Sequence, residues 1–279
     1  MKMKIFDCIT FFRENFITNI RFEILNNCVD YFVICESNFD HNGKKKNLNF
    51  KLKNLSFKNK IIYIVLDHPF PNHLKNGWQR QAYQRDYMLS KIENAKSEDY
   101  IMFSDPDEIP NPKKLKNLKL KKKYAIFLQN HYVYKFNIFN EYDTPWEGTR
   151  ICKFFNLKSI DYMRQKVLLK NLRKWWRPDK ERSIQIINNG GWHFKDIFSP
   201  KELSIKLKTF AHKEFSISTF SNIEIIRNKI REKKDLYNKN QLFYKVELDK
   251  NFPKYILDNQ KKFKKMVATR QGKKYTNNQ

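Results

Sequence analysis

The stretch Tyr-Ile-Met-Phe-Ser-Asp-Pro-Asp-Glu-Ile-Pro at residues 100–110 is the most informative part of this chain. It starts with a short apolar run, YIMF, which is typical of a buried strand, and three acids follow within four positions. Acids this close together raise one another's pKa unless a cation offsets their charge. Because ligands of α/β sheets bind outside the carboxyl ends of strands, the spacing of Asp105 and Asp107 predicts a site for a hard divalent cation. Such a cation can bridge to a diphosphate.

A structural explanation of the same acids is an acidic turn in which Asp107 or Glu108 caps a following helix. D-x-D is also a short and common pattern by itself. The strand before it favours the metal site, and Pro106 and Pro110 stiffen the loop so that both aspartates stay on one side.

Apolar and amphipathic segments alternate on both sides of this stretch. Strands are expected at residues 4–9, 31–35 and 61–66, and helices at residues 16–27 and 78–95. This alternation predicts an α/β domain with a mostly parallel central sheet flanked by helices.

The second half of the chain is less regular. Residues 124–139 are aromatic and strand-like, and helices are expected near residues 200–212 and 222–237, which gives a helical C-terminal part. We expect a single domain over residues 1–266, followed by a basic, flexible tail at residues 267–279.

The composition indicates a folded protein with a sizeable core. Of 279 residues, 41% are hydrophobic and 24 are phenylalanine, which excludes a disordered chain. The apolar runs are strand-sized, well short of the roughly 20 residues that a membrane-spanning helix needs. Asp7 interrupts the basic and apolar N-terminus, which is therefore a poor signal peptide. The four cysteines, most of them beside apolar residues, indicate buried thiols in a reducing compartment, so we expect a cytoplasmic protein.

The charge of the chain is strongly positive. Lys and Arg total 56 and Asp and Glu total 29, which gives a net charge of +27 and attracts nucleic acid, anionic lipid or nucleotide-linked substrates. Basic residues around Trp175 and Trp176 suit single-stranded nucleic acid or a membrane interface. Much of the lysine is scattered, however, and a coding sequence rich in A and T explains the excess equally well.

Other segments also carry side chains that suit ligand binding. Glu36 and Ser37 follow the strand at residues 31–35 and would suit a base or a ribose, although ordinary turn chemistry explains them equally. His193 follows the only double glycine of the chain and is either a metal or phosphate ligand or a hydrogen-bonded core histidine. Arg85, on the second expected helix, suits phosphate or carboxylate recognition, or a solvated helix face.

Seven stretches of the chain, taken in order, carry a resemblance to a known family. They are IFDCITFF, VDYFVICESNFDHNGK, GWQRQAYQRDYM, DYIMFSDPDEIP, WEGT, GGWHF and FPKYILDNQKKF. Together they cover nearly the whole chain and resemble glycosyltransferase family 17. The resemblance implies a GT-A-like fold, an α/β nucleotide-sugar-binding domain with a D-x-D metal site. It also implies an inverting reaction with a UDP-sugar donor, expected to be UDP-N-acetylglucosamine, and Mn²⁺ or Mg²⁺ as the cofactor.

The resemblance further implies roles for individual residues. These are Asp105 and Asp107 on the D-x-D, Glu36 and Ser37 on the donor side, Arg85 at the diphosphate and His193 as a metal ligand. Gln81 stands where many relatives carry an acid, so its helix is expected to meet the substrate differently. Animal members of the family have a membrane anchor and lumenal disulfides. This chain shows neither pattern, so we expect a cytoplasmic enzyme, peripheral at most to the inner face of a membrane, with a glycan or lipid-linked glycan acceptor.

The expected mechanism places the cation on Asp107, aided by the rest of the predicted site, where it offsets charge on the leaving UDP. A carboxylate then removes the proton of the acceptor hydroxyl. Glu108, beside the metal site, is the expected base, and Asp196 and Glu202 are the alternatives.

Three other functions remain open from the sequence. A basic nucleic-acid-binding protein would explain the charge, but the acidic cluster repels phosphate without a metal, so nucleic acid is not the expected partner. A metal-dependent nuclease or nucleotidyltransferase could use the same acids, and an inactive sugar-binding relative would keep the same motifs. The sequence has no G-x-x-x-x-G-K loop, no G-x-G-x-x-G, no H-E-x-x-H and no G-x-S-x-G, which argues against several other enzyme classes.

Overall fold

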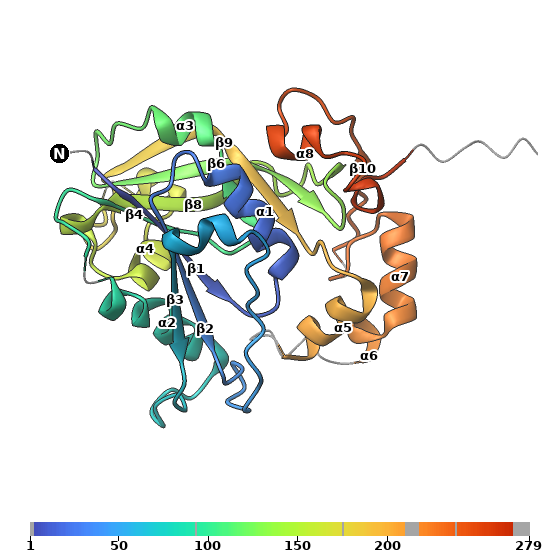
Figure 1. The fold of residues 1–279 in the computed structure, drawn as a ribbon, viewed down its shortest axis with the longest axis horizontal. Helices are drawn as coiled ribbons and strands as arrows, with labels where there is room; N and C mark the ends of the chain where they lie inside the picture. Colours follow the sequence, from blue (N-terminus) through green and yellow to red (C-terminus); the bar gives the residue numbers. More distant parts are fainter. Residues whose placement is uncertain (1–2, 93, 175, 210–217, 238, 270–279) are drawn as a thin grey trace, which may run out of the picture.

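A mixed β-sheet forms the centre of the computed structural model, and helices cover both of its faces (Figure 1). The structure describes residues 3–92, 94–174, 176–209, 218–237 and 239–269. The strands are β1 (Ile5–Phe11), β2 (Tyr31–Ser37), β3 (Ile61–Leu66), β4 (Tyr100–Phe103), β5 (Glu108–Pro110), β6 (Tyr124–Val133), β7 (Ile138–Phe139), β8 (Trp146–Lys153), β9 (Ile184–Lys195) and β10 (Tyr244–Lys245). The helices are α1 (Asn15–Leu25), α2 (Gly77–Tyr87), α3 (Pro112–Lys116), α4 (Ile160–Lys166), α5 (Pro200–Thr209), α6 (Ser218–Ser221), α7 (Ile223–Glu232) and α8 (Lys254–Asp258).

The order of the strands explains why the sheet is mixed. It reads β10-β7-β6-β8-β4-β1-β2-β3, and β9 pairs with both β6 and β5. β1 runs parallel to β2 and β4, and β2 runs parallel to β3, as the alternation of strands and helices predicts. β8 then pairs antiparallel with β4 and β6, and β9 returns parallel to β6. The α/β class is therefore confirmed, with the continuous parallel part formed by the first four strands.

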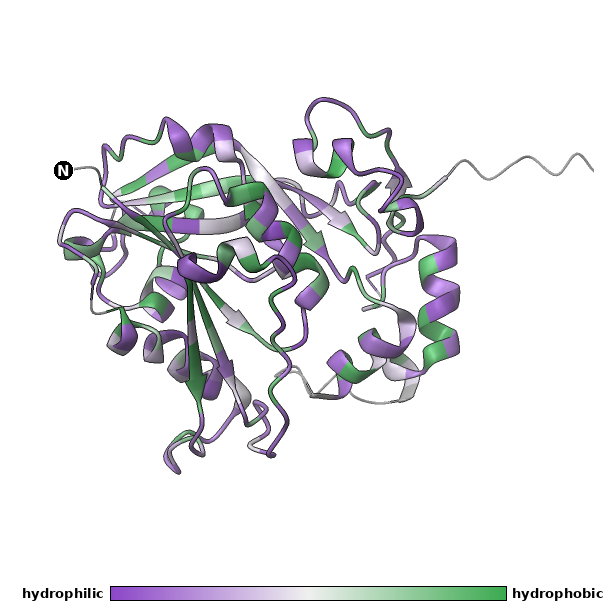
Figure 2. Ribbon diagram, in the orientation of Figure 1, coloured by the Kyte–Doolittle hydropathy of each residue, from purple (hydrophilic) through white to green (hydrophobic). Residues whose placement is uncertain are grey.

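Two apolar clusters fill the space between the sheet and its helices. Ile9 of β1 lies in the same cluster as Ile20 of α1 on one face, whereas Cys8 of β1 lies in the same cluster as Met163 of α4 on the other. Successive side chains of a strand point to opposite faces, so a strand buried on both sides reads as a continuous apolar run. Figure 2 shows this pattern as hydrophobic central strands among helices of mixed hydropathy.

A buried charge network fixes α1 against the carboxyl end of β4. Arg21 of α1 donates to both carboxylate oxygens of Asp7 in β1, at 2.6 and 2.7 Å. The same guanidinium donates to Ser104 Oγ at 2.7 Å and to the backbone oxygen of Glu108 at 2.6 Å. Because Arg21 and Asp7 are almost completely buried, this network holds the acidic loop (residues 104–108) in one position.

The second expected helix is shorter than its sequence pattern suggests. α2 begins after Asn76, whose side chain accepts a hydrogen bond from the Gln79 backbone at 3.0 Å, and it ends at Tyr87. A 3-10 turn at Leu89–Lys91 follows, and buried side chains on both sides of this turn pack into the same apolar cluster.

The C-terminal helices pack on the other end of the sheet. Leu203 and Leu207 of α5 and Ile226 of α7 form a third apolar cluster with residues at the ends of β6 and β7. The packed chain extends beyond Met266, because Ala268 is buried and its N–H donates to Asn137 Oδ1 at 2.7 Å. The rest of the predicted tail, residues 270–279, lies outside the described residues. Within the described ranges, no helix combines the length and the apolar character needed to cross a membrane.

Candidate active site

A cleft of about 940 Å³ opens at the carboxyl ends of the parallel strands. Ser37 at the end of β2 lies on one wall, and Asp105 and Asp107 of the acidic loop lie beyond β4. The loop before β8, Trp146 at the start of β8 and His193 near the end of β9 also line the cleft. The structure therefore brings Ser37, Asp105, Asp107 and His193 into one cleft, although they lie far apart in the sequence.

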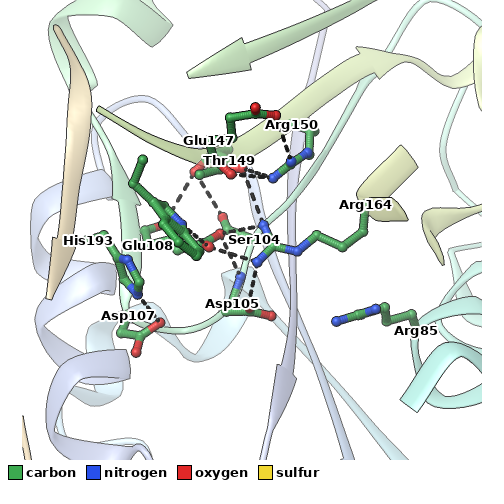
Figure 3. Close-up of polar contacts among 12 residues, drawn as sticks. Arg85, Ser104, Asp105, Asp107, Glu108, Glu147, Thr149, Arg150, Arg164 and His193 are labelled. Atoms are coloured by element: carbon green, nitrogen blue, oxygen red, sulfur yellow. Dashed lines mark hydrogen bonds and ion pairs between the residues drawn. The ribbon is translucent and has the colours of Figure 1, made fainter. Parts of the chain in front are cut away.

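Arg164 of α4 neutralises the acidic loop from within the protein (Figure 3). It donates to Asp105 Oδ2 at 2.7 Å and to the two carboxylate oxygens of Glu108 at 2.9 and 3.1 Å. Burial acts to raise the pKa of Asp105, but the positive charges of Arg164 and then Arg85 outweigh it and hold this pKa below its usual value. The sequence predicted a divalent cation beside these acids, whereas the positive charge that the structure shows there comes from an arginine 56 to 59 residues further along the chain.

Glu108 is not placed to act as the base that the sequence analysis proposed. Its side chain is completely buried, and Trp146 Nε1 donates to its Oε1 at 2.7 Å in addition to the bonds from Arg164. The Asp105 backbone N–H also donates to its Oε2, at 3.2 Å. Because both oxygens are occupied inside the protein, Glu108 fixes the shape of the acidic loop and has no carboxylate oxygen open to a substrate in the cleft.

The double glycine brings His193 to the acidic loop. In β9, Gly191 has φ +140°, and a Cβ atom there would lie 2.1 Å from the backbone oxygen of Ile109. Only glycine lets β9 approach β5 this closely, and the resulting register pairs His193 with Glu108. His193 Nε2 then lies 3.6 Å from Asp107 Oδ1.

Asp107 and His193 form the donor set that fits a divalent cation. Their side chains are 13% and 7% exposed, and Figure 3 shows them facing each other. His193 Nδ1 is buried without a hydrogen-bond partner among the described residues. No three His, Cys, Asp or Glu side chains of the described residues gather into a complete metal cage. A hard cation such as Mg²⁺ is commonly held by one or two protein ligands, with substrate phosphate and water completing its shell, so the residues fit a cation that binds together with a diphosphate.

Arg85 and Ser37, two of the residues that the resemblance singled out, both line the cleft. Arg85 Nη1 donates to Asp161 Oδ1 of α4 at 2.9 Å, and its Nε is buried without a hydrogen-bond partner among the residues that the structure describes. Its guanidinium points toward Asp105 in Figure 3. Ser37 Oγ accepts a hydrogen bond from the Phe39 backbone at 3.0 Å and keeps its own proton to donate.

Glu36, the other predicted donor-side residue, faces away from the cleft. Its side chain is completely buried and accepts hydrogen bonds from Lys46 Nζ at 3.1 Å, from Tyr63 Oη at 2.9 Å and from two backbone N–H groups of the following loop. These partners belong to β3 and to the loop after β2 and occupy both carboxylate oxygens, so Glu36 holds residues 46–50 against the sheet and is not placed to bind a base or a ribose.

A stack of three rings lies beside the Asp107–His193 pair and was not anticipated from the sequence as a unit. His131 of β6 stacks on His193 with ring centroids 4.4 Å apart, and Trp146 contacts both rings at 5.6 and 4.8 Å. Burial, and then the neighbouring His193, lower the pKa of His131 far below its usual value, so this ring is neutral. The only sequence signals were the WEGT stretch and a lone histidine in an aromatic strand, neither of which shows that the rings meet.

The alternative bases of the sequence analysis have other partners. Asp196 lines the cleft but is 2% exposed and lies 3.1 Å from both Lys206 Nζ and the Tyr237 hydroxyl. Glu202 accepts hydrogen bonds from the backbone and hydroxyl of Ser199 at 2.9 and 2.6 Å, which caps the start of α5.

Of the predicted tryptophan pair at residues 175 and 176, residue 175 lies outside the described residues, and the side chain of Trp176 is 61% exposed.

Comparison with known proteins gives one family match over nearly the whole chain. The model of glycosyltransferase family 17 matches residues 1–270. The β-1,4-mannosyl-glycoprotein 4-β-N-acetylglucosaminyltransferase of Rattus norvegicus is 33% identical over 116 residues, 38% of this chain and 22% of the rat protein. The Homo sapiens protein of the same name is 36% identical over 101 residues, 33% of this chain and 19% of the human protein. The matched part thus spans about a fifth of the length of these relatives.

Solved structures give weaker similarities. A glycosyltransferase involved in glycosylation of the major capsid of PBCV-1 has 10% identity and a TM-score of 0.29, covering 66% of this chain and 81% of its own. The inositol-1-phosphate CTP transferase from T. maritima has 12% identity and a TM-score of 0.34, covering 84% of this chain and 98% of its own. Similarities at this level carry no argument about the site.

Proposed function

The chain belongs to glycosyltransferase family 17, and we propose that it transfers N-acetylglucosamine from a UDP-sugar to a hydroxyl of a glycan or glycolipid. The transfer inverts the anomeric carbon and uses a divalent cation. The observation that carries this proposal is the Asp107–His193 pair, which faces a cleft large enough for a nucleotide sugar.

The side chains around this pair have separate tasks in the proposed reaction. Asp107 and His193 would hold Mn²⁺ or Mg²⁺, which offsets the charge that develops on the leaving UDP. Arg85 lines the cleft with its Nε unpartnered among the described residues and is the candidate diphosphate partner, and the Ser37 hydroxyl, also on the cleft, is a candidate contact for the donor. Arg164 holds Asp105 ionised and fixed, so that the loop carrying Asp107 does not have to be ordered when substrate binds.

The cleft also bears on the nucleic-acid alternative. Eight Lys or Arg and seven Asp or Glu side chains line it, so the surplus of positive charge is not concentrated there. A groove that follows a phosphate backbone needs such a concentration. The near balance supports a substrate with a small local charge, such as a diphosphate that arrives with a cation.

Thermal unfolding in the presence of nucleotide sugars tests the proposal. UDP-N-acetylglucosamine at about 100 times its dissociation constant should stabilise the wild-type protein by about 2.7 kcal/mol in the presence of Mn²⁺. EDTA should remove most of this stabilisation, and Asp107→Ala should remove it while the protein without ligand still unfolds cooperatively. Asp67→Ala, which removes an exposed acid outside the cleft, is the matched control and should respond as wild type. The absence of a shift with UDP-, GDP-, CMP- and dTDP-sugars alike would contradict a nucleotide-sugar function.

The basic surface supports a second part of the proposal, namely peripheral contact with an anionic membrane where a lipid-linked acceptor lies. Seven lysines and no acid occur between Lys113 and Lys123, and all seven side chains are exposed. We call residues 113–123 the lysine ridge. Anionic lipid attracts such clusters with about 1 kcal/mol per basic residue near the surface.

A further inference from the structure

The carboxylates that line the cleft differ in what already binds them. Seven acidic side chains line it, namely Glu14, Asp40, Asp105, Asp107, Asp143, Glu147 and Asp196. A general base must have an oxygen free to take a proton, and a permanent ion pair with Lys or Arg opposes protonation. The partners of each acid therefore separate the candidates.

Four of the seven carboxylates are already engaged. Three lie beside a Lys or Arg, and the fourth belongs to the candidate metal site. Asp105 is paired with an arginine at 2.7 Å, Asp196 with a lysine at 3.1 Å, and Glu147 lies 3.6 Å from an arginine. Asp107 is the carboxylate of the candidate metal site. Asp105 and Asp196, whose partner cations hold their pKa below the usual value, are poor proton acceptors, and Glu147 and Asp107 already have an arginine neighbour or the metal-binding role.

Glu14 and Asp40 instead hold their own loops. One oxygen of Glu14 accepts the backbone N–H groups of residues 12 and 13, each at 2.9 Å. One oxygen of Asp40 accepts those of residues 42 and 44, also at 2.9 Å, and Asp40 is 9% exposed. Each keeps a second oxygen without a hydrogen bond among the described residues, but two backbone N–H groups tie each carboxylate to its own loop, and neither is linked to the Asp107–His193 pair through a chain of contacts as Asp143 is.

Asp143 is different. Its side chain is 28% exposed to the cleft, and its Oδ2 accepts a hydrogen bond from the Asn140 amide at 3.2 Å and lies 3.8 Å from His131 Nδ1. Within the described part of the chain, no Lys or Arg lies within ion-pair distance of it, and its Oδ1 has no hydrogen-bond partner. The Asn140 side chain also accepts the Asp143 backbone N–H at 3.3 Å, so the carboxylate is held in place by an uncharged neighbour.

The position of Asp143 relative to the metal-binding pair suits a base. Asp107 Oδ1 lies 3.6 Å from His193 Nε2, and the rings of His193 and His131 stack with centroids 4.4 Å apart. His131 Nδ1 in turn lies 3.8 Å from Asp143 Oδ2. Two rings thus separate Asp143 from Asp107, and both carboxylates line the same cleft. This separation fits a carboxylate that acts beside the cation site without being a ligand of the cation.

We propose that Asp143 is the general base of the transfer reaction, an inference that rests on the proposed function. The acceptor hydroxyl oxygen forms a bond to the anomeric carbon, and the bond from that carbon to the β-phosphate oxygen breaks. UDP leaves with the electron pair of that bond. The hydroxyl proton moves to the free oxygen of Asp143.

Azide separates a base from a residue that only positions substrate. With water as the acceptor, hydrolysis of UDP-N-acetylglucosamine requires the base, so Asp143→Asn should lower its rate about 100-fold or more. Azide is an anion with no proton to lose, so the variant should form the glycosyl azide at the wild-type rate. Asp143→Ser provides a second variant with the same expectation. Glu141→Gln removes an exposed charge two residues away and should leave both reactions unchanged.

The outcomes distinguish this inference from the proposed function. Hydrolysis by Asp143→Asn and Asp143→Ser within tenfold of wild type would overturn the assignment, and so would an equal loss of the azide reaction in variants that bind the donor normally. A wild-type protein that neither binds nor hydrolyses UDP-N-acetylglucosamine with Mn²⁺ would instead reject the proposed function, and the base assignment with it.

Discussion

Arg164 is the residue on which the charge balance of the acidic loop depends. Its guanidinium is 12% exposed and pairs with two carboxylates, one of which, Glu108, is completely buried. The attraction of Asp105 and Glu108 raises the pKa of Arg164 despite its burial, so the cation is permanent. The loop is therefore preorganised by the protein, and a cation bound as proposed would have to offset only the charge of Asp107.

Replacing this arginine should destabilise the fold. Arg164→Met leaves the Glu108 carboxylate buried without its cation, a change that costs about 3–5 kcal/mol in comparable sites. Urea unfolding at pH 7 measures the effect. The double variant Arg164→Met with Glu108→Gln is the control, since it removes the uncompensated charge and should recover part of the loss. A single variant within 1 kcal/mol of wild type would show that the pair contributes little.

The sequence identified some site residues and missed others for a physical reason. Consecutive residues of a strand point to opposite faces, so of Glu36 and Ser37 only one can face the cleft, and the pattern does not say which. The structure gives that place to Ser37. The sequence also could not tell which of two adjacent acids faces the cleft. Asp107 lines the cleft, whereas the side chain of Glu108 is buried inside the protein.

At the scale of the elements, strands were more predictable than the contacts between them. The apolar runs at residues 31–35 and 61–66 lie in β2 and β3, and their parallel pairing follows from the helices between them. The pairing of β9 with both β5 and β6 did not follow, because it depends on how closely backbones approach at the double glycine. The role of α4 was also hidden, since Arg164 meets its partners only through tertiary packing.

The end of β9 holds the C-terminal helices through Asp196. Asp196 has φ +56°. Its carboxylate accepts hydrogen bonds from Lys206 Nζ of α5 and from the hydroxyl of Tyr237, a residue that follows α7. Burial acts to raise its pKa, but the charges of Lys206 and Lys195 outweigh it and hold the pKa below its usual value. A carboxylate whose folded pKa is lowered contributes stability above its unfolded pKa, about 3.9, and this contribution is lost as the pH falls through the folded value.

Asp196→Asn should therefore have a pH-dependent effect. Asparagine tolerates the left-handed backbone, so the change removes charge without new strain. At pH 7 the variant should be less stable by about 1.5–3 kcal/mol, and this difference should shrink as the pH falls below about 4. Urea unfolding across the pH range measures both. A difference that stays constant from pH 7 to pH 3 would show that the ionised carboxylate is not responsible.

At the scale of the whole molecule, the surplus charge and the cleft are separate features. The net charge is +27, yet the side chains lining the cleft are nearly balanced in charge. The surplus therefore lies on other surfaces, of which the lysine ridge is a concentrated example. Because electrostatic attraction to a surface acts over about a Debye length, such a ridge can hold the protein at a charged surface without entering the reaction.

Vesicle flotation tests whether the lysine ridge has this role. Wild-type protein should float with vesicles that contain phosphatidylserine and not with neutral vesicles, and the binding should weaken as salt rises. Changing Lys119, Lys121 and Lys122 to Gln should lower the partition coefficient by roughly 100-fold, since each lysine contributes about 1 kcal/mol. The matched control changes three exposed lysines elsewhere, Lys51, Lys53 and Lys201, to Gln, and removes the same charge. If both triple variants lose binding equally, net charge and not the ridge attracts the protein; if wild type does not prefer anionic vesicles, the lysine excess has no membrane role and reflects only composition.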